Sequence, residues 1–185
     1  LPFKIRLAKI EPQIVNQAEI DLLKKALLEK KTHRSIIHRD LLMLDTLAMT
    51  GMRRGELANL KIGDVYFNNG RSQLVVKNGK GSKDRIIPLN PTIAKRLQEY
   101  IGDRKRSEKV FLISASQLSH KIHDWAIKAG IPQIHTHSFR HKFATDLLNK
   151  GANIRTLQSL LGHSSLAITE RYLSVTDEDK VRAVC

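Results

Sequence analysis

The sequence predicts a mainly α-helical domain that contains one small three-stranded antiparallel β-sheet, an α+β fold. Apolar residues recur at helical spacing along most of the 185 residues. Between residues 64 and 88 this pattern gives way to short β-prone runs separated by Asn- and Gly-containing turns. A single domain of this length buries about 70% of its unfolded surface and needs no disulfides. The chain holds one cysteine, Cys185, so no internal disulfide or cysteine metal site is expected.

The sequence of residues 1–60 predicts two long helices and a short one. Residues 1–15 are expected to be an arm or linker. Asn16, followed three residues later by a glutamate, is typical of a helix N-terminal capping box. A second helix from about Ser35 carries apolar residues at i, i+4, i+7 and i+11, and we expect it to end near Gly51. A short helix is expected over residues 54–60.

The sheet is predicted from three β-prone runs at residues 65–67, 74–76 and 85–87. The turns between them are Asn68–Gly70 and Asn78–Gly81. Because both connections are short and contain turn residues, neighbouring strands are expected to pair antiparallel.

After Pro91 the sequence again shows helical periodicity, with apolar residues on one face of the expected helix. The basic run at residues 104–106 is expected to be a solvated loop. Glycines stand where several of these helices are expected to stop. Further helices are predicted over residues 116–129, 138–150, 153–161, 165–172 and 177–183.

The charge balance points to a polyanionic partner. Lys and Arg number 32 and Asp and Glu 18, so the net charge is 32 − 18 = +14. Such a charge favours nucleic acid, whose neutralised phosphates release counterions. An anionic membrane surface and a merely basic soluble protein are the alternatives. No apolar stretch approaches the ~20 residues of a membrane span. The composition suits a reducing compartment, and we expect a cytoplasmic protein, associated with the nucleoid if prokaryotic.

Two segments in the first half carry candidate site residues. In Thr50–Leu57 a Thr-Gly break lies one residue before Arg53, and a rigidly held guanidinium suits a phosphate. The alternative is a surface arginine paired with Glu56. The second segment, residues 79–85, is typical of a glycine-rich hairpin tip carrying Lys80 and lacks the spacing of a P-loop. The alternative is a solvated turn.

The third segment places His137 and Arg140 at i and i+3 of a new helix for which Thr136 is a candidate N-cap. A helix N-terminus favours an anion. An ordinary capped helix with exposed polar residues is the alternative. A metal site is a rival because His135 and His141 lie close by. It is not favoured, since no carboxylate or cysteine accompanies the histidines.

The fourth segment follows the helix predicted to stop at Gly162. His163 stands at this corner, and Tyr172 lies nine residues further on. Taken alone, these residues also fit a helix turn with a packed tyrosine.

Together and in this order, the four segments resemble the tyrosine recombinases, the phage-integrase family. The resemblance extends from residue 50 to residue 172. It implies the catalytic-domain fold of that family and a supporting role for Glu56. It also implies six catalytic residues: Arg53, Lys80, His137, Arg140, His163 and Tyr172. The chain departs from the family after the nucleophile, where it has Leu173-Ser174-Val175 in place of a Thr/Ser-His pair.

The resemblance implies a site-specific DNA recombinase or integrase that cuts and rejoins strands through a 3′-phosphotyrosyl intermediate, without metal, ATP or another cofactor. Its expected partners are double-stranded DNA and further copies of itself, with which it would form a tetramer on DNA. For the isolated domain, a monomer is the alternative. Residues 16–185 are expected to be the catalytic domain, and the N-terminal core-binding domain of relatives to be absent from this chain. Three alternatives stay open. They are a type IB topoisomerase-like enzyme, a non-catalytic DNA-binding module, and a protein that binds nucleic acid by charge alone.

Overall fold

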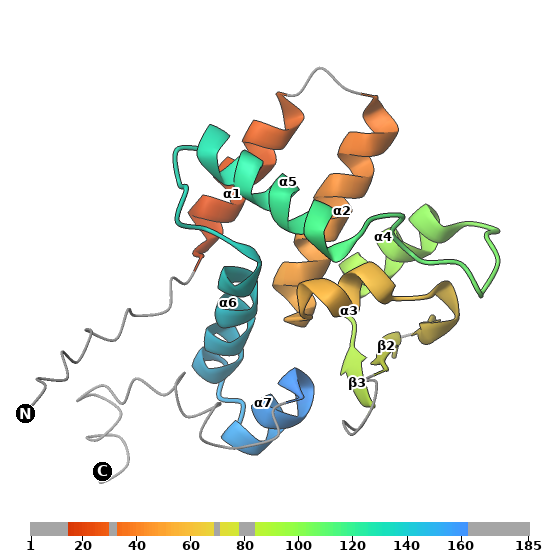
Figure 1. Ribbon diagram of the computed structural model, residues 1–185. Helices are drawn as coiled ribbons and strands as arrows, with labels where there is room; N and C mark the ends of the chain where they lie inside the picture. The colour runs from red at the N-terminus through yellow and green to blue at the C-terminus, as the bar shows by residue number, and fades with distance from the viewer. Residues whose placement is uncertain (1–14, 30–32, 69–70, 78–83, 163–185) are drawn as a thin grey trace, which may run out of the picture.

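The computed structural model describes residues 15–29, 33–68, 71–77 and 84–162. Within these residues it contains α-helices, one 3₁₀ turn and one β-sheet (Figure 1). The helices are α1 (Gln17–Leu28), α2 (Arg34–Thr50), α3 (Arg54–Asn59), α4 (Pro91–Ile101), α5 (Ala115–Lys128), α6 (Thr136–Asn149) and α7 (Ile154–Leu161).

Local sequence signals account for the ends of the first two helices. The Asn16 side chain accepts a hydrogen bond from the Glu19 backbone N–H, and the Glu19 carboxylate accepts one from the Asn16 N–H. Helix α2 ends at Gly51, whose φ of 60° lies in the left-handed region that glycine adopts without strain. This break turns the chain directly toward Arg53.

The sheet has the order β1-β2-β3 and is antiparallel throughout. Its strands are β1 (Val65–Tyr66), β2 (Gln73–Val76) and β3 (Arg85–Pro88). Leu74 pairs with Ile87 and Val76 with Arg85, which puts Arg85 on the buried face of β3 together with Ile87. A 3₁₀ turn, Ile62–Asp64, leads into β1 and was not expected from the sequence.

The main hydrophobic core lies among the helices and one face of the sheet. Its largest buried side chains are Trp125, Phe111 and Phe139. Helix α2 packs against α1, α4 and α6, and α5 packs against α1 and α3. A smaller core joins α6 to α7 through Phe143, Ala144, Leu157 and Leu161. Figure 1 shows α7 beyond the end of α6, where it also contacts β3.

The predicted fold class is confirmed, and besides the 3₁₀ turn two further differences concern the start of α6 and the end of the arm. Helix α6 begins at Thr136, two residues earlier than expected, and its N-cap residue is His135 rather than Thr136. The reason is that the Ser138 hydroxyl oxygen accepts a hydrogen bond from the His135 backbone N–H at 3.3 Å, which closes the first turn one residue earlier. Val15, at the end of the expected arm, is buried in the main core.

Some expectations fall outside the described residues. These are the arm up to residue 14, the tip of the β2–β3 hairpin at 78–83, and the helices expected over 165–172 and 177–183. In the described parts, no helix combines the length and apolarity needed to cross a membrane.

Candidate active site

An open cleft of about 460 Å³ lies between α3, the end of β2 and the first turn of α6. Arg53 and Arg54 line it from the start of α3, and His137 lines it from α6. Lys77 contributes from the end of β2 and pairs with Asp64 at 2.5 Å. Hydrogen bonding to this carboxylate raises the pKa of Lys77, so its ammonium group stays charged. Three cations and a histidine thus border the cleft, together with the carboxylates of Glu56 and Asp64 and several uncharged side chains.

Arg53 is the N-cap residue of α3 and is held in place by Glu56. The Glu56 carboxylate accepts a hydrogen bond from the Arg53 backbone N–H at 2.7 Å and another from Nη1 at 2.9 Å. A carboxylate in the first turn also complements the positive helix N-terminus. The Arg53 side chain remains 41% exposed, so its guanidinium faces the cleft while its backbone is held.

Glu56 has a second cationic partner, Arg85 of β3. The Arg85 Nη1 and Nη2 groups donate to the two Glu56 carboxylate oxygens at 2.9 and 2.7 Å, a bidentate pair. Burial by itself would raise the pKa of Glu56. The hydrogen bonds from Arg85 and the Arg53 backbone, with the charge of Arg85, outweigh burial and lower that pKa below its ordinary 4.5. Glu56 is therefore ionised at neutral pH.

Arg140 lies behind the cleft and is only 4% exposed. Its Nη1 group donates to the Gly51 carbonyl at 2.7 Å, and its Nη2 group donates to the Leu161 carbonyl. Arg140 thus ties α6 both to the break before Arg53 and to the end of α7.

Three arginines meet the last carbonyls of α7. Arg85 Nε donates to the Leu160 carbonyl at 2.7 Å, and Arg140 donates to that of Leu161. The Gly162 carbonyl lies 3.5 Å from Arg53 Nη2. The final carbonyls of a helix lack partners within the helix and carry partial negative charge, so cations stabilise them. The end of α7 is thereby fastened to α3, β3 and α6.

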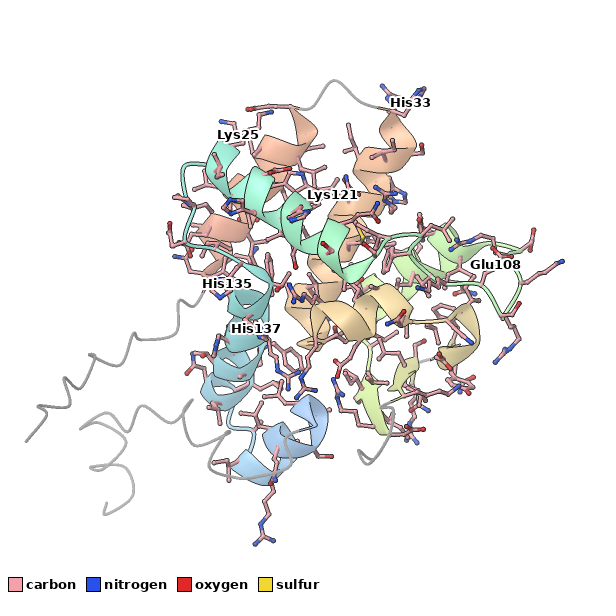
Figure 2. All side chains as sticks on the ribbon, in the orientation of Figure 1. Lys25, His33, Glu108, Lys121, His135 and His137 are labelled. Carbon is pink, nitrogen blue, oxygen red and sulfur yellow. The ribbon has the colours of Figure 1, made fainter. Side chains whose placement is uncertain are left out.

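His137 lies in the first turn of α6, close to His135 (Figure 2). By area it is exposed, but neighbouring atoms still shield the ring from part of the solvent. This partial burial is the main cause of its lowered pKa, and the positive charges of His135, Arg140, Arg54 and Arg53 lower it further. The imidazole is therefore mainly neutral at pH 7 and able to accept a proton.

Comparison with known proteins agrees with this arrangement. The sequence model of the phage integrase family matches residues 14–179. The chain belongs to the phage integrase family. A tyrosine recombinase from Pseudothermotoga lettingae is 40% identical over 153 residues, which are 79% of this chain and 53% of that protein.

Solved structures share the fold of this integrase-family chain. The XerA recombinase has a TM-score of 0.73 at 31% identity, over 94% of this chain and 64% of that one. A XerH site-specific recombinase bound to its difH substrate has a TM-score of 0.76 at 24% identity, over 96% of this chain and 55% of that one. The second likeness concerns the fold alone. The chain spans about half the length of the curated relatives it matches.

The structure brings part of the expected integrase site together. Arg53 and His137 line one cleft. Arg140 lies behind that cleft and is linked to the segment before Arg53 through Gly51. Lys80, His163 and Tyr172 lie outside the described residues. Among the residues that the structure does describe, no group of three His, Cys, Asp or Glu side chains is placed to hold a metal ion.

Sequence reasoning missed Arg85 as a member of this site. The sequence places Arg85 at the end of the hairpin-tip segment 79–85 and at the start of a β-prone run, without a role of its own. A signal was nevertheless available, because side chains two apart on a strand share a face. Arg85 alternates with the apolar Ile87, so it points into the core, and a buried guanidinium requires an anionic partner.

Proposed function

We propose that this chain is the catalytic part of a site-specific DNA recombinase or integrase that cuts and rejoins strands through a 3′-phosphotyrosyl intermediate. The observation that carries the proposal is the held but partly exposed Arg53 guanidinium, which shares one cleft with a neutral His137. Membership of the phage integrase family and the names of the relatives support the same activity. DNA would be the substrate, as it is for the XerH protein solved with difH. The reaction would then occur in the cytoplasm.

The proposed chemistry begins with binding of one phosphodiester in the cleft. Its transition state gathers negative charge on the non-bridging oxygens, and preorganised donors stabilise that charge. Arg53 would contact these oxygens from α3, and Arg140, rigidly held from behind, would do so from α6. His163 would donate a further hydrogen bond, and its attachment to Gly162 beside Arg53 supports this assignment.

The covalent step exchanges one phosphate ester for another. The Tyr172 hydroxyl oxygen attacks phosphorus, the bond from phosphorus to the 5′ oxygen breaks, and a 3′-phosphotyrosyl link forms. His137 would accept the tyrosine proton, since a phenol of pKa ~10 needs a base near neutral pH. Lys80 would donate a proton to the leaving 5′ oxygen. The link conserves the energy of the broken ester, so a second 5′-hydroxyl can reverse the step without ATP.

The test is covalent capture of DNA. The chain is incubated with nicked duplexes of randomised central sequence, from which the short 5′-hydroxyl fragment dissociates after cleavage. We expect a detergent-resistant protein–DNA adduct whose linkage maps to Tyr172. Tyr172→Phe should form no adduct and should bind the duplex within about twofold of the parent, because only the nucleophilic oxygen is removed.

Tyr100→Phe is the matched control, because Tyr100 stacks on Phe111 with ring centroids 5.6 Å apart and lies outside the cleft. This variant should retain adduct formation. An adduct of undiminished yield with Tyr172→Phe, or no adduct with the parent chain, would contradict the proposal. Captured sites are then placed in pairs on plasmids. Exchange between sites indicates a recombinase that assembles in several copies, and relaxation without exchange indicates topoisomerase-like activity.

A further inference from the structure

We propose that Arg85 is a positioning residue that neutralises Glu56 and so leaves Arg53 with a net positive charge toward the cleft. This inference rests on the proposed function, because it explains how Arg53 stays available for a phosphate although it is bonded to a carboxylate.

The contacts around Glu56 carry the inference. Its two carboxylate oxygens each receive one hydrogen bond from Arg85 and one from Arg53. One of the Arg53 bonds comes from the backbone N–H and the other from the guanidinium. One negative charge therefore lies between two guanidinium groups, and the cluster as a whole carries one positive charge.

Burial indicates where that remaining charge lies. The side chains of Arg85 and Glu56 are 5% and 10% exposed, whereas that of Arg53 is 41% exposed. Attraction between opposite charges is stronger away from water, and a buried carboxylate needs a close partner. The bidentate Arg85–Glu56 pair is thus the inner, neutral unit. Arg53 is the outer group, and its charge faces the open cleft.

Arg85 is held too firmly to contact a ligand in the cleft itself. Its strand pairs with β2 opposite Val76, and its Nε group donates to the Leu160 carbonyl at 2.7 Å. The Cβ that a side chain at Gly162 would carry lies 3.0 Å from Arg85 Cδ, so the guanidinium stem is enclosed on that side as well. Arg85 does not line the cleft. Its influence on a bound phosphate must pass through Glu56 and Arg53.

Without Arg85, Glu56 would have only Arg53 as a cationic partner in this cluster. The two would form a neutral pair, and a phosphate would have to compete with the carboxylate for the guanidinium. Removing the charge of Glu56 as well should return Arg53 to the ligand. A purely structural role for Arg85 does not predict this recovery, because the second substitution replaces a further acceptor oxygen of the cluster by an NH₂ group.

The experiment measures sulfate affinity by NMR titration, with the His137 ring and arginine Nε–H signals as reporters. Sulfate mimics a phosphate and does not change protonation near neutral pH. Arg85→Met should weaken sulfate binding about tenfold, and Arg85→Met with Glu56→Gln should restore it to within about threefold of the parent. Arg85→Lys retains the charge without the bidentate geometry and should also stay within about threefold. The initial rate of DNA adduct formation should follow the same order.

A matched control exists elsewhere in the chain. Asp45 likewise lies between two cations, Lys24 at 2.6 Å and Arg96 at 2.5 Å, and none of the three lines the cleft. Arg96→Met, alone or with Asp45→Asn, should leave sulfate affinity and adduct rate unchanged. Thermal unfolding curves of all variants show whether each one is folded and how far its Tm is shifted from that of the parent.

The inference is overturned if folded Arg85→Met binds sulfate as the parent does, if the double variant is no better than the single one, or if Arg85→Lys is as weak as Arg85→Met. Should Arg85→Met not fold, Arg85→Lys takes its place, and sulfate binding about tenfold weaker in folded Arg85→Lys than in the parent would overturn the inference. No sulfate binding by the parent would also overturn it. Failure of the proposed function is distinguishable, because the sulfate series would then follow the expected order while the parent forms no DNA adduct.

Discussion

Arg53 and Arg140 carry the same charge but lie in different surroundings. Arg53 is partly exposed at the cleft, and among the described residues its side chain contacts Glu56 and the end of α7. Arg140 is buried and holds two backbone carbonyls, those of Gly51 and Leu161. Two of its five N–H groups thus have a structural role in addition to any contact with DNA.

We therefore expect Arg53→Ala and Arg140→Ala both to reduce adduct formation but to differ in stability. Arg140→Ala leaves two buried carbonyls without this donor, and it should lower the free energy of unfolding by about 2–4 kcal/mol. Arg53→Ala removes a partly exposed group and should cost less than about 1 kcal/mol, since Glu56 keeps Arg85 as its partner. Urea unfolding at pH 7 measures both. Equal stability of the two variants would contradict the structural role of Arg140.

At the scale of elements, the site depends on where two helices stop. Helix α2 ends at Gly51 and α7 at Gly162, both with positive φ. Each stop presents carbonyls to the arginines, and the first turns the chain toward Arg53. Gly51 is also closely enclosed, because a Cβ there would overlap the Phe143 ring and lie 3.2 Å from Leu161 Cδ2.

Gly51→Ala should therefore destabilise the chain by about 3 kcal/mol, from the left-handed backbone and from overlap with Phe143. Gly130→Ala is the control, since Gly130 has φ +74° and, apart from its chain neighbours, no described residue comes within 4 Å of an added Cβ. It should cost only about 1–2 kcal/mol for the backbone. Urea unfolding of the two variants gives the difference that belongs to the overlap. If Gly51→Ala cost no more than Gly130→Ala, the close packing of α2 against α6 and α7 would be refuted.

For the whole molecule, the net charge of +14 exceeds what one scissile phosphate requires. The described carboxylates Asp40, Asp45 and Asp64 are each paired with lysine or arginine, which leaves a positive excess over the chain. This excess would follow the DNA backbone on either side of the cleft.

Affinity for random-sequence duplex DNA should accordingly fall steeply with salt. If six phosphates are neutralised, the slope of log K against log salt concentration should be about −5. Fluorescence anisotropy over a salt series measures it, and Tyr172→Phe should give the same slope, since it removes no charge. A slope near zero would mean that the chain does not bind DNA through its positive charge.

The sequence by itself determined most of the elements and the family. Helix periodicity, the Asn16 cap, the glycine stops and the turns between β-runs all depend on neighbours a few residues apart, so they can be read locally. The four motif segments indicated Arg53 and His137, and both line the same cleft. The catalytic roles of all six residues remain predictions, and Lys80, His163 and Tyr172 also lie outside the described parts.

Only the tertiary structure decided how the arginines are used. Arg85 reaches Glu56 across 29 residues and Leu160 across 75, and Arg140 reaches Gly51 across 89. The packing of α3, β3, α6 and α7 against one another determines these hydrogen-bond partners. No local sequence pattern encodes them. The 3₁₀ turn before β1 is likewise fixed by a distant segment, because the Ile62 N–H donates to the Glu108 carbonyl and the Gly63 N–H to the Arg106 carbonyl. Local propensities thus define the elements, while burial and charge pairing between distant segments define which guanidinium faces the cleft.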